Sequence, residues 1–186
     1  MKVKTKKLVL LSLFAALMCV VSPFSLPVGM VPISLATFVL YLTSAVLGAS
    51  GTASVLVYLL IGAVGLPVFS GGLGGLERLV GPTGGYLVGY LPCALIAGLI
   101  IDRYENKKLA YPIAMMAGTA VLYIIGTAWF IFLMGAKGTP YTVGAALMTC
   151  VVKFLPGDAV KIAAAGTAGF ALRKILARTS FGKVRT

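Results

Sequence analysis

One stretch decides the fold of this chain: Gly71-Gly72-Leu73-Gly74-Gly75-Leu76-Glu77-Arg78-Leu79-Val80-Gly81-Pro82-Thr83-Gly84-Gly85-Tyr86. Its seven glycines and one proline disfavour a stable helix, yet long apolar runs flank it on both sides. Irregular backbone at membrane depth is tolerated only where protein buries it or where it lines a cavity. The pattern therefore predicts a loop that covers or enters a polar pocket, although a plain extracellular connector accounts for the spacing equally well.

The composition predicts a protein that lies in a lipid bilayer. The 186 residues are 60% hydrophobic and include four acidic residues and no histidine. A soluble domain of this size cannot bury that much apolar surface. Because the apolar runs are continuous rather than alternating, we expect helices and exclude a transmembrane barrel. The predicted fold class is an all-α integral membrane protein, with residues 1–186 in a single membrane domain.

Six membrane-spanning helices are predicted from the apolar runs and from the prolines and charges that end them. Their approximate ranges are 8–24, 33–48, 52–66, 84–101, 109–134 and 156–177. A glycine-rich loop, 67–83, separates the third helix from the fourth. The run 141–154 is too short for a full span of about 20 residues. It is therefore either a short interfacial helix or a seventh span.

The distribution of charge favours six spans with both termini in the cytoplasm. With six spans, twelve of the 16 basic residues lie on one face, as the positive-inside rule expects. Seven spans would place the two terminal basic clusters on opposite sides of the membrane. The same sorting explains the formal charge of +12 by contacts with the lipid bilayer rather than with nucleic acid. We therefore expect a multi-pass protein of the cell membrane.

The first lysines resemble the start of a secretory signal peptide, but no small-x-small cleavage site follows them, so we expect a retained first helix.

The chain lacks the signatures of a nucleotide site or of a catalytic centre. No Rossmann fingerprint and no Gly-Lys-Ser/Thr motif occurs, and there is no histidine or Gly-x-Ser-x-Gly. The three cysteines lie far apart, so neither a metal site nor a cofactor is expected. We expect a transport or binding protein rather than an enzyme, with the energy for active transport supplied by another protein.

The strongest polar signal is the motif Leu155-Pro156-Gly157-Asp158-Ala159-Val160-Lys161. It places Asp158 in the first turn of the last helix and Lys161 three residues later on the same face. Ionisable groups in such a helix usually face the bundle interior or a cavity. The pair offers an acceptor beside a donor, which suits a urea, amide or lactam. A structural ion pair that starts the helix is the competing interpretation.

Three further residues near the glycine-rich loop are candidates for the same site. Glu77 and Arg78 form a second polar pair, for which solvated loop charges are the alternative. Tyr86 begins the next helix and is expected either to place its ring in the cavity or to lie at the membrane interface.

The first helix carries small residues at helical spacing: Ser12 with Ala16, and Ala15 with Cys19. Such faces let helices approach closely in lipid. They serve either the packing of the bundle itself or the docking of a partner helix.

Taken together, these motifs resemble the BioY family, the biotin-binding substrate components (S-components) of energy-coupling-factor transporters. The resemblance lies in Gly71–Gly75 with Gly81–Tyr86, in Val31-Pro32-Ile33-Ser34-Leu35, and in the helix that carries Asp158 and Lys161. It implies six helices, a vitamin bound near the outer surface, and a lid formed by the loop between the first two helices. It also implies docking through the first helix, at Ser12, Ala15, Ala16 and Cys19, on a transmembrane coupling subunit that two ATPase subunits drive.

The resemblance also implies how biotin is held. The ureido ring of biotin would bind Asp158 and Lys161, and its apolar parts would contact Phe69, Leu73 and Tyr86. We expect Gly74, Gly75 and Glu77 to complete the loop side of the site. The resemblance does not assign a residue to the carboxylate, and Arg78 is our own candidate for it. Leu73 and Leu87 depart from the family, because some members have a polar residue and an arginine at these positions.

Two other functions are compatible with the sequence. The same fold could bind another vitamin, such as thiamine or riboflavin, although the predicted outer face carries only two acidic residues to attract cationic thiamine. Alternatively, the chain could be a membrane scaffold whose glycine-rich loop is purely structural.

Overall fold

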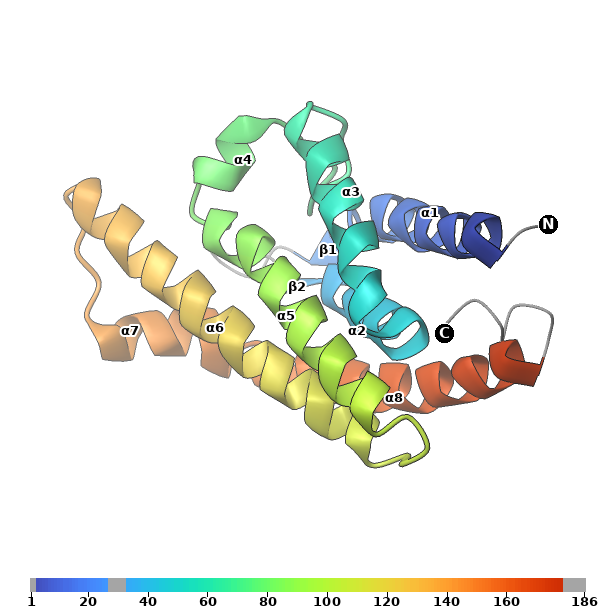
Figure 1. Cartoon of the computed structure of the whole chain (residues 1–186). Helices are drawn as coiled ribbons and strands as arrows, with labels where there is room; N and C mark the ends of the chain where they lie inside the picture. Colours follow the sequence, from blue (N-terminus) through green and yellow to red (C-terminus); the bar gives the residue numbers. More distant parts are fainter. Residues whose placement is uncertain (1–2, 27–32, 179–186) are drawn as a thin grey trace.

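The computed structural model describes residues 3–26 and 33–178 of the chain (Figure 1). The described part is helical apart from one short antiparallel pair, β1 (Ser25–Leu26) with β2 (Ile33–Ser34). The prediction of an all-α fold is therefore confirmed. The segment 27–32, which holds Pro32 and most of the predicted lid, lies outside the described residues.

Except for α4, the helices of the described residues correspond to the predicted apolar runs, with ends that differ by several residues. They are α1 (Val3–Val21), α2 (Ala36–Leu47), α3 (Thr52–Ala63), α4 (Leu76–Val80), α5 (Gly84–Arg103), α6 (Ala110–Ala136), α7 (Val143–Leu147) and α8 (Leu155–Arg178). The helix predicted for 33–48 starts later, because Ile33 and Ser34 pair with the strand that follows α1. The helix predicted for 8–24 begins already at Val3, so its first turns include lysines that precede the apolar run.

Three helical stretches are long and apolar enough to cross a membrane: Ala36–Ala63, Gly84–Arg103 and Ala110–Ala136. A fourth is added if Val143–Val152 and Leu155–Arg178, which meet at a bend of 40°, count as one span. The stretch Ala36–Ala63 contains a 3-10 turn, η1 (Gly48–Gly51), where Gly48 has a φ of 62°. Thr37 at the start of α2 lines the same pocket as Phe69, which packs on Gly62 near the end of α3. The chain therefore reverses at η1.

The glycine-rich segment is not wholly a loop, which corrects the expectation for 67–83. The short helix α4 forms where Leu76–Val80 has no glycine. The glycines lie around it, and Gly75 just before α4 has a φ of 99°, a conformation that favours glycine. Gly74 has no room for a side chain, because a Cβ would collide with the backbone oxygens of Leu66 and Gly65. The glycines thus let the chain fold tightly back onto the end of α3.

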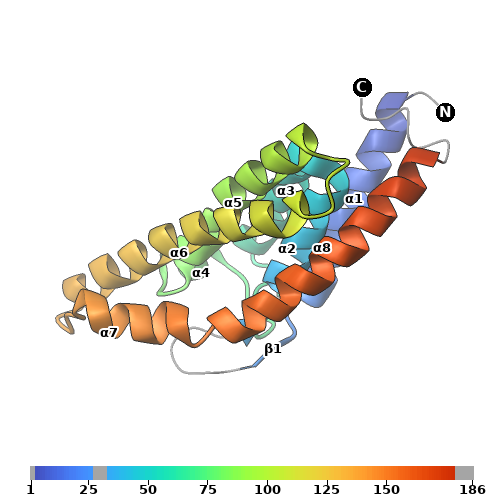
Figure 2. The same cartoon turned by 90° about the horizontal axis from the view of Figure 1, so that it is seen from below.

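The segment predicted for 141–154 is broken rather than uniform. It contains α7 and one turn of π-helix, η2 (Met148–Val152). Thr142 caps α7, because its hydroxyl accepts a hydrogen bond from the backbone N–H of Ala145 at 3.3 Å. After the bend that follows η2, α8 runs toward the end of the molecule where α1 starts (Figure 2).

Close helix contacts at small residues hold the bundle together. A Cβ at Gly126 of α6 would meet the ring of Tyr86 in α5, and a Cβ at Gly169 of α8 would meet Ala45 in α2. Both views show the start of α1, the turn between α5 and α6, and the end of α8 at the same end of the molecule (Figures 1 and 2). The turn between α6 and α7 lies at the opposite end.

Candidate functional site

A pocket of about 250 Å³ lies among α2, α5, α6, α8 and the glycine-rich segment. The chain contributes lining residues from every one of these elements: Ser34, Thr37, Phe69, Ser70, Leu73, Arg78, Pro82, Thr83, Tyr86, Leu87, Tyr90, Leu122, Tyr123, Phe154, Asp158 and Lys161. Most of the lining is apolar or aromatic, with a few charged and hydroxyl groups, as is usual for sites that bind small molecules.

Asp158 and Lys161 form an ion pair in the wall of the pocket. Lys161 Nζ lies 3.0 Å from Asp158 Oδ1, and Asp158 is only 5% exposed. The first turn of α8 brings them together, because residues three apart lie on the same face of a helix. The prediction that these two side chains face a cavity is in line with the geometry, since both line the pocket.

The ion pair is already satisfied by residues of the protein. Lys161 Nζ also donates to the backbone oxygen of Ser34 at 2.8 Å and to Thr37 Oγ1 at 2.9 Å. Asp158 Oδ2 accepts a hydrogen bond from Tyr123 Oη at 2.6 Å. The three donors of Lys161 therefore all have partners, whereas the carboxylate keeps spare acceptor capacity.

Aromatic rings form the apolar walls. Phe69 is 2% exposed and meets Tyr58 edge to face, with ring centroids 5.6 Å apart. Its backbone pairs with that of Leu73 across the tight turn at Gly71 and Gly72. Tyr86 packs on Gly126 and donates a hydrogen bond from Oη to the backbone oxygen of Cys150 at 3.1 Å, within the π-helical turn. Tyr86 thus lies inside the bundle, which agrees with the interpretation that its ring faces the cavity rather than the membrane interface.

The remaining predicted residues belong to the glycine-rich segment, and only some of them line the pocket. Arg78 and Leu73 line the pocket, whereas Gly74, Gly75 and Glu77 are not among its lining residues. Glu77 is exposed, so it does not contribute a carboxylate to the lining. Gly74 and Gly75 act on the site through the path of the backbone, as described above.

The small residues of α1 face two directions. Ala15 is buried and Cys19 is partly buried against the core, so this pair packs within the bundle. Ser12 and Ala16 are exposed, together with Leu13 and Leu17. Of the two predicted faces, the one with Ser12 and Ala16 is open to lipid or to a partner helix.

Sequence reasoning missed the hydroxyl groups that surround the ion pair. Tyr123 comes from the middle of α6, Ser34 from β2 and Thr37 from the first turn of α2. The available signal was weak: a tyrosine inside an apolar helix and two hydroxyl residues near a helix start. Within the described part of the chain, no group of three or more His, Cys, Asp or Glu side chains could hold a metal ion.

Comparisons with known proteins agree on one family. A model of the BioY family matches residues 1–178. The biotin transporter BioY of Thermotoga maritima is 34% identical over 91% of this chain and 97% of its own length. The biotin transporter BioY of Rhodobacter capsulatus is 35% identical over 87% of this chain and 90% of its own.

A solved structure shares the fold. It is described as the S-component for biotin from an ECF-type ABC transporter, and it is 25% identical to this chain. The TM-score is 0.85, and the match covers 98% of this chain and 97% of the other. The match of the family model over nearly the whole sequence, the identity to curated relatives and the shared fold together show that this chain belongs to the BioY family.

Proposed function

We propose that this protein binds biotin in the pocket between α2, α5, α6 and α8 and mediates its uptake as the substrate-specific subunit of an ECF-type transporter. Relatives that match over most of their length are named as biotin transporters, and the structural neighbour is an S-component for biotin. The observation that carries the proposal is the acceptor–donor pair Asp158–Lys161 in the wall of an otherwise largely apolar pocket.

The chemistry of the pocket suits the two parts of biotin. The ureido ring presents two N–H donors and one C=O acceptor, and Asp158 has free lone pairs for the donors. The ureido oxygen needs a donor, so it must take over one of the bonds that Lys161 makes to Ser34 or Thr37. Phe69, Leu73 and Tyr86 supply apolar surface for the thiophane ring and the valeryl chain.

The proposed membrane arrangement is six spans in the cell membrane, with both termini in the cytoplasm. The start of α1 and the end of α8 lie at the same end of the molecule as the basic turn between α5 and α6, which supports this topology (Figure 1). The pocket lies toward the other end, where a vitamin from outside would enter. The proposed partners are a transmembrane coupling subunit, which would contact the exposed face of α1 at Ser12 and Ala16, and two ATPase subunits that supply the energy.

The experiment that tests the function is equilibrium binding of biotin to the purified full-length protein in detergent. The wild type should bind biotin saturably, and Asp158→Ala should weaken binding by about 1–3 kcal/mol, because it leaves Lys161 without its counter-charge and Tyr123 without its acceptor. Lys153→Gln, an exposed charge that does not line the pocket, should leave the affinity unchanged. A wild type that does not bind biotin, or an Asp158→Ala variant that binds normally, would refute the proposed site.

A further inference from the structure

Among the described residues that line the pocket, one charged side chain forms no ion pair. Three of the described lining residues are charged, namely Arg78, Asp158 and Lys161. Asp158 and Lys161 neutralise each other as an ion pair. The net positive charge of the lining therefore rests on Arg78.

The guanidinium of Arg78 has unmet hydrogen-bonding capacity. Its Nε is buried and has no hydrogen-bond partner, and no ion pair to Arg78 occurs among residues 3–26 and 33–178. The neighbouring acid, Glu77, is exposed and outside the lining. A buried donor without an acceptor is costly, so a group that accepts from Arg78 would stabilise the site.

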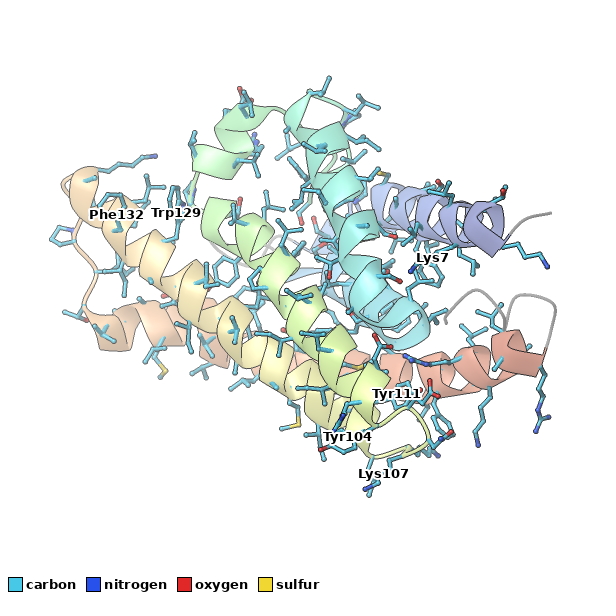
Figure 3. The ribbon with its side chains drawn as sticks, viewed as in Figure 1. Lys7, Tyr104, Lys107, Tyr111, Trp129 and Phe132 are labelled. Atoms are coloured by element: carbon cyan, nitrogen blue, oxygen red, sulfur yellow. The ribbon has the colours of Figure 1, made fainter. Side chains whose placement is uncertain are left out.

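The helix that carries Arg78 is fixed at both ends. Before α4, the backbone N–H of Gly75 donates to the oxygen of Gly62 in α3 at 2.8 Å. After α4, the indole of Trp129 in α6 donates to the oxygen of Gly81 at 2.9 Å. Figure 3 shows Trp129 at the end of α6 that lies near this segment. The backbone that carries Arg78 is thus held in place before a ligand arrives, which lowers the entropic cost of binding.

Arg78 and the ion pair Asp158–Lys161 can bind two different ends of one ligand. Arg78 of α4 lines the same pocket as Asp158 and Lys161 of α8. A ligand whose polar head lies at Asp158 and Lys161 can therefore reach Arg78 with its other end. The far end of such a ligand meets a planar cation with several N–H donors, which is the geometry that binds a carboxylate through two parallel hydrogen bonds.

We propose that Arg78 binds the carboxylate of the ligand and makes the pocket selective for the free acid over neutral derivatives. This inference rests on the proposed function, because it takes biotin as the ligand and places the ureido ring at Asp158. It assigns to Arg78 a task for which the rest of the described lining offers no free cation, since the three donors of Lys161 are occupied.

The test compares two ligands on three proteins. Dissociation constants of biotin and of biotinamide, in which a neutral amide replaces the carboxylate, are measured by calorimetry on the full-length wild type, Arg78→Gln and Glu77→Gln. The wild type should prefer biotin by about 10- to 100-fold, the range expected for hydrogen bonds to charged groups. In Arg78→Gln this preference should vanish, because biotin weakens while biotinamide keeps its affinity. Glu77→Gln, on the same helix but outside the pocket, should bind both ligands as the wild type does.

Each other outcome has a definite meaning. If Arg78→Gln weakens both ligands equally, the side chain shapes the pocket and does not hold the carboxylate, which overturns the inference. If the wild type binds biotin without preference, or if Arg78→Gln keeps the preference, Arg78 is a solvated charge and the inference is wrong while the proposed function stands. If the wild type binds neither ligand, the proposed function fails and the inference fails with it.

Discussion

At the scale of single residues, the site is a small polar network inside an apolar wall. Asp158 is held by three side chains from three helices: Lys161 of α8, Thr37 of α2 and Tyr123 of α6. The shortest of these bonds comes from Tyr123, at 2.6 Å. Hydrogen bonds to a carboxylate are stronger than neutral ones, so the bond from Tyr123 should help the ion pair to hold the acid in place.

Substitution of Tyr123 tests that statement. Tyr123→Phe keeps the ring but removes the donor to Asp158, so the ligand-free protein should lose about 1.5–3 kcal/mol of stability. Thermal unfolding in detergent measures the change. Tyr104→Phe, at an exposed tyrosine in the turn after α5, is the matched control and should unfold as the wild type does. Equal melting temperatures for all three proteins would show that the bond from Tyr123 contributes nothing to stability.

The residues of the site could be predicted only in part. Asp158 and Lys161 were identifiable because charges are rare in apolar helices, and their spacing places them on one face. Tyr123, Ser34 and Thr37 were not identifiable, because only the packing of α2 and α6 against α8 brings them to the pair. Glu77 resembled Arg78 in the sequence, but the turn of α4 places it outside the pocket.

At the scale of elements, α8 is tied to α2 along its length. Near the pocket, Lys161 donates to Thr37 in the first turn of α2 and to Ser34 just before it. Near the other end, Arg173 Nη1 donates to the backbone oxygen of Ala45 at 3.2 Å, and Gly169 packs on the same residue. The contact between α2 and α8 therefore has a basic side chain of α8 at each end, Lys161 near the pocket and Arg173 away from it.

Arg173 also connects α2 and α8 to α5. It is 4% exposed, and its Nη2 lies 2.6 Å from Asp102 Oδ1 and 3.2 Å from Glu105 Oε2. Asp102 in turn accepts from the backbone N–H of Ala49 in η1 at 2.8 Å. One arginine thus links the ends of α5, α2 and α8.

Removal of this arginine should loosen the end of the bundle away from the pocket. Arg173→Met keeps much of the buried volume but removes the bonds that the guanidinium makes to Ala45, Asp102 and Glu105. Because the two acids are partly exposed and water can solvate them, we expect a loss of about 1–3 kcal/mol in stability rather than the larger cost of a fully buried pair. Thermal unfolding measures it, with the exposed Arg178→Met as control. A variant as stable as the wild type would contradict the linking role.

The helices themselves were predictable, whereas their ends and breaks were not. Long apolar runs identify α5 and α6 because no other structure buries such a run in lipid. The glycine-rich segment hid α4, because the average helix propensity over the segment is poor although Leu76–Val80 alone contains no glycine. The π-helical turn at Met148–Val152 has no comparable sequence signal, and tertiary contacts such as the bond from Tyr86 to Cys150 accompany it.

At the scale of the whole molecule, the two ends differ in character. The pocket and the glycine-rich segment lie toward one end, and the lysines of α1 and of the turn after α5 lie toward the other. Figure 3 shows Lys7 and Lys107 far from Trp129, in agreement with this division. Such a polarity is what a protein needs if it receives a ligand on one side of the membrane and meets its energising partners on the other.

Site-directed labelling tests the orientation. Lys107→Cys and Lys137→Cys are made in a background without Cys19, Cys93 and Cys150, and both positions are exposed. A maleimide that does not cross membranes should label Lys137→Cys in intact cells, because the turn after α6 is predicted to face outward. Lys107→Cys should be labelled only after the cells are opened. The reverse pattern would invert the proposed topology, and labelling of both would exclude it.

The bond between Trp129 and Gly81 gives the molecule an optical reporter of its own. The chain contains a single tryptophan, and this indole is partly buried beside the segment that carries Pro82 and Thr83 into the pocket wall. All indole emission of the protein therefore originates beside the rim of the pocket. A ligand that enters the pocket changes the surroundings of that one fluorophore, so its binding is expected to be visible in the unmodified chain without an attached dye.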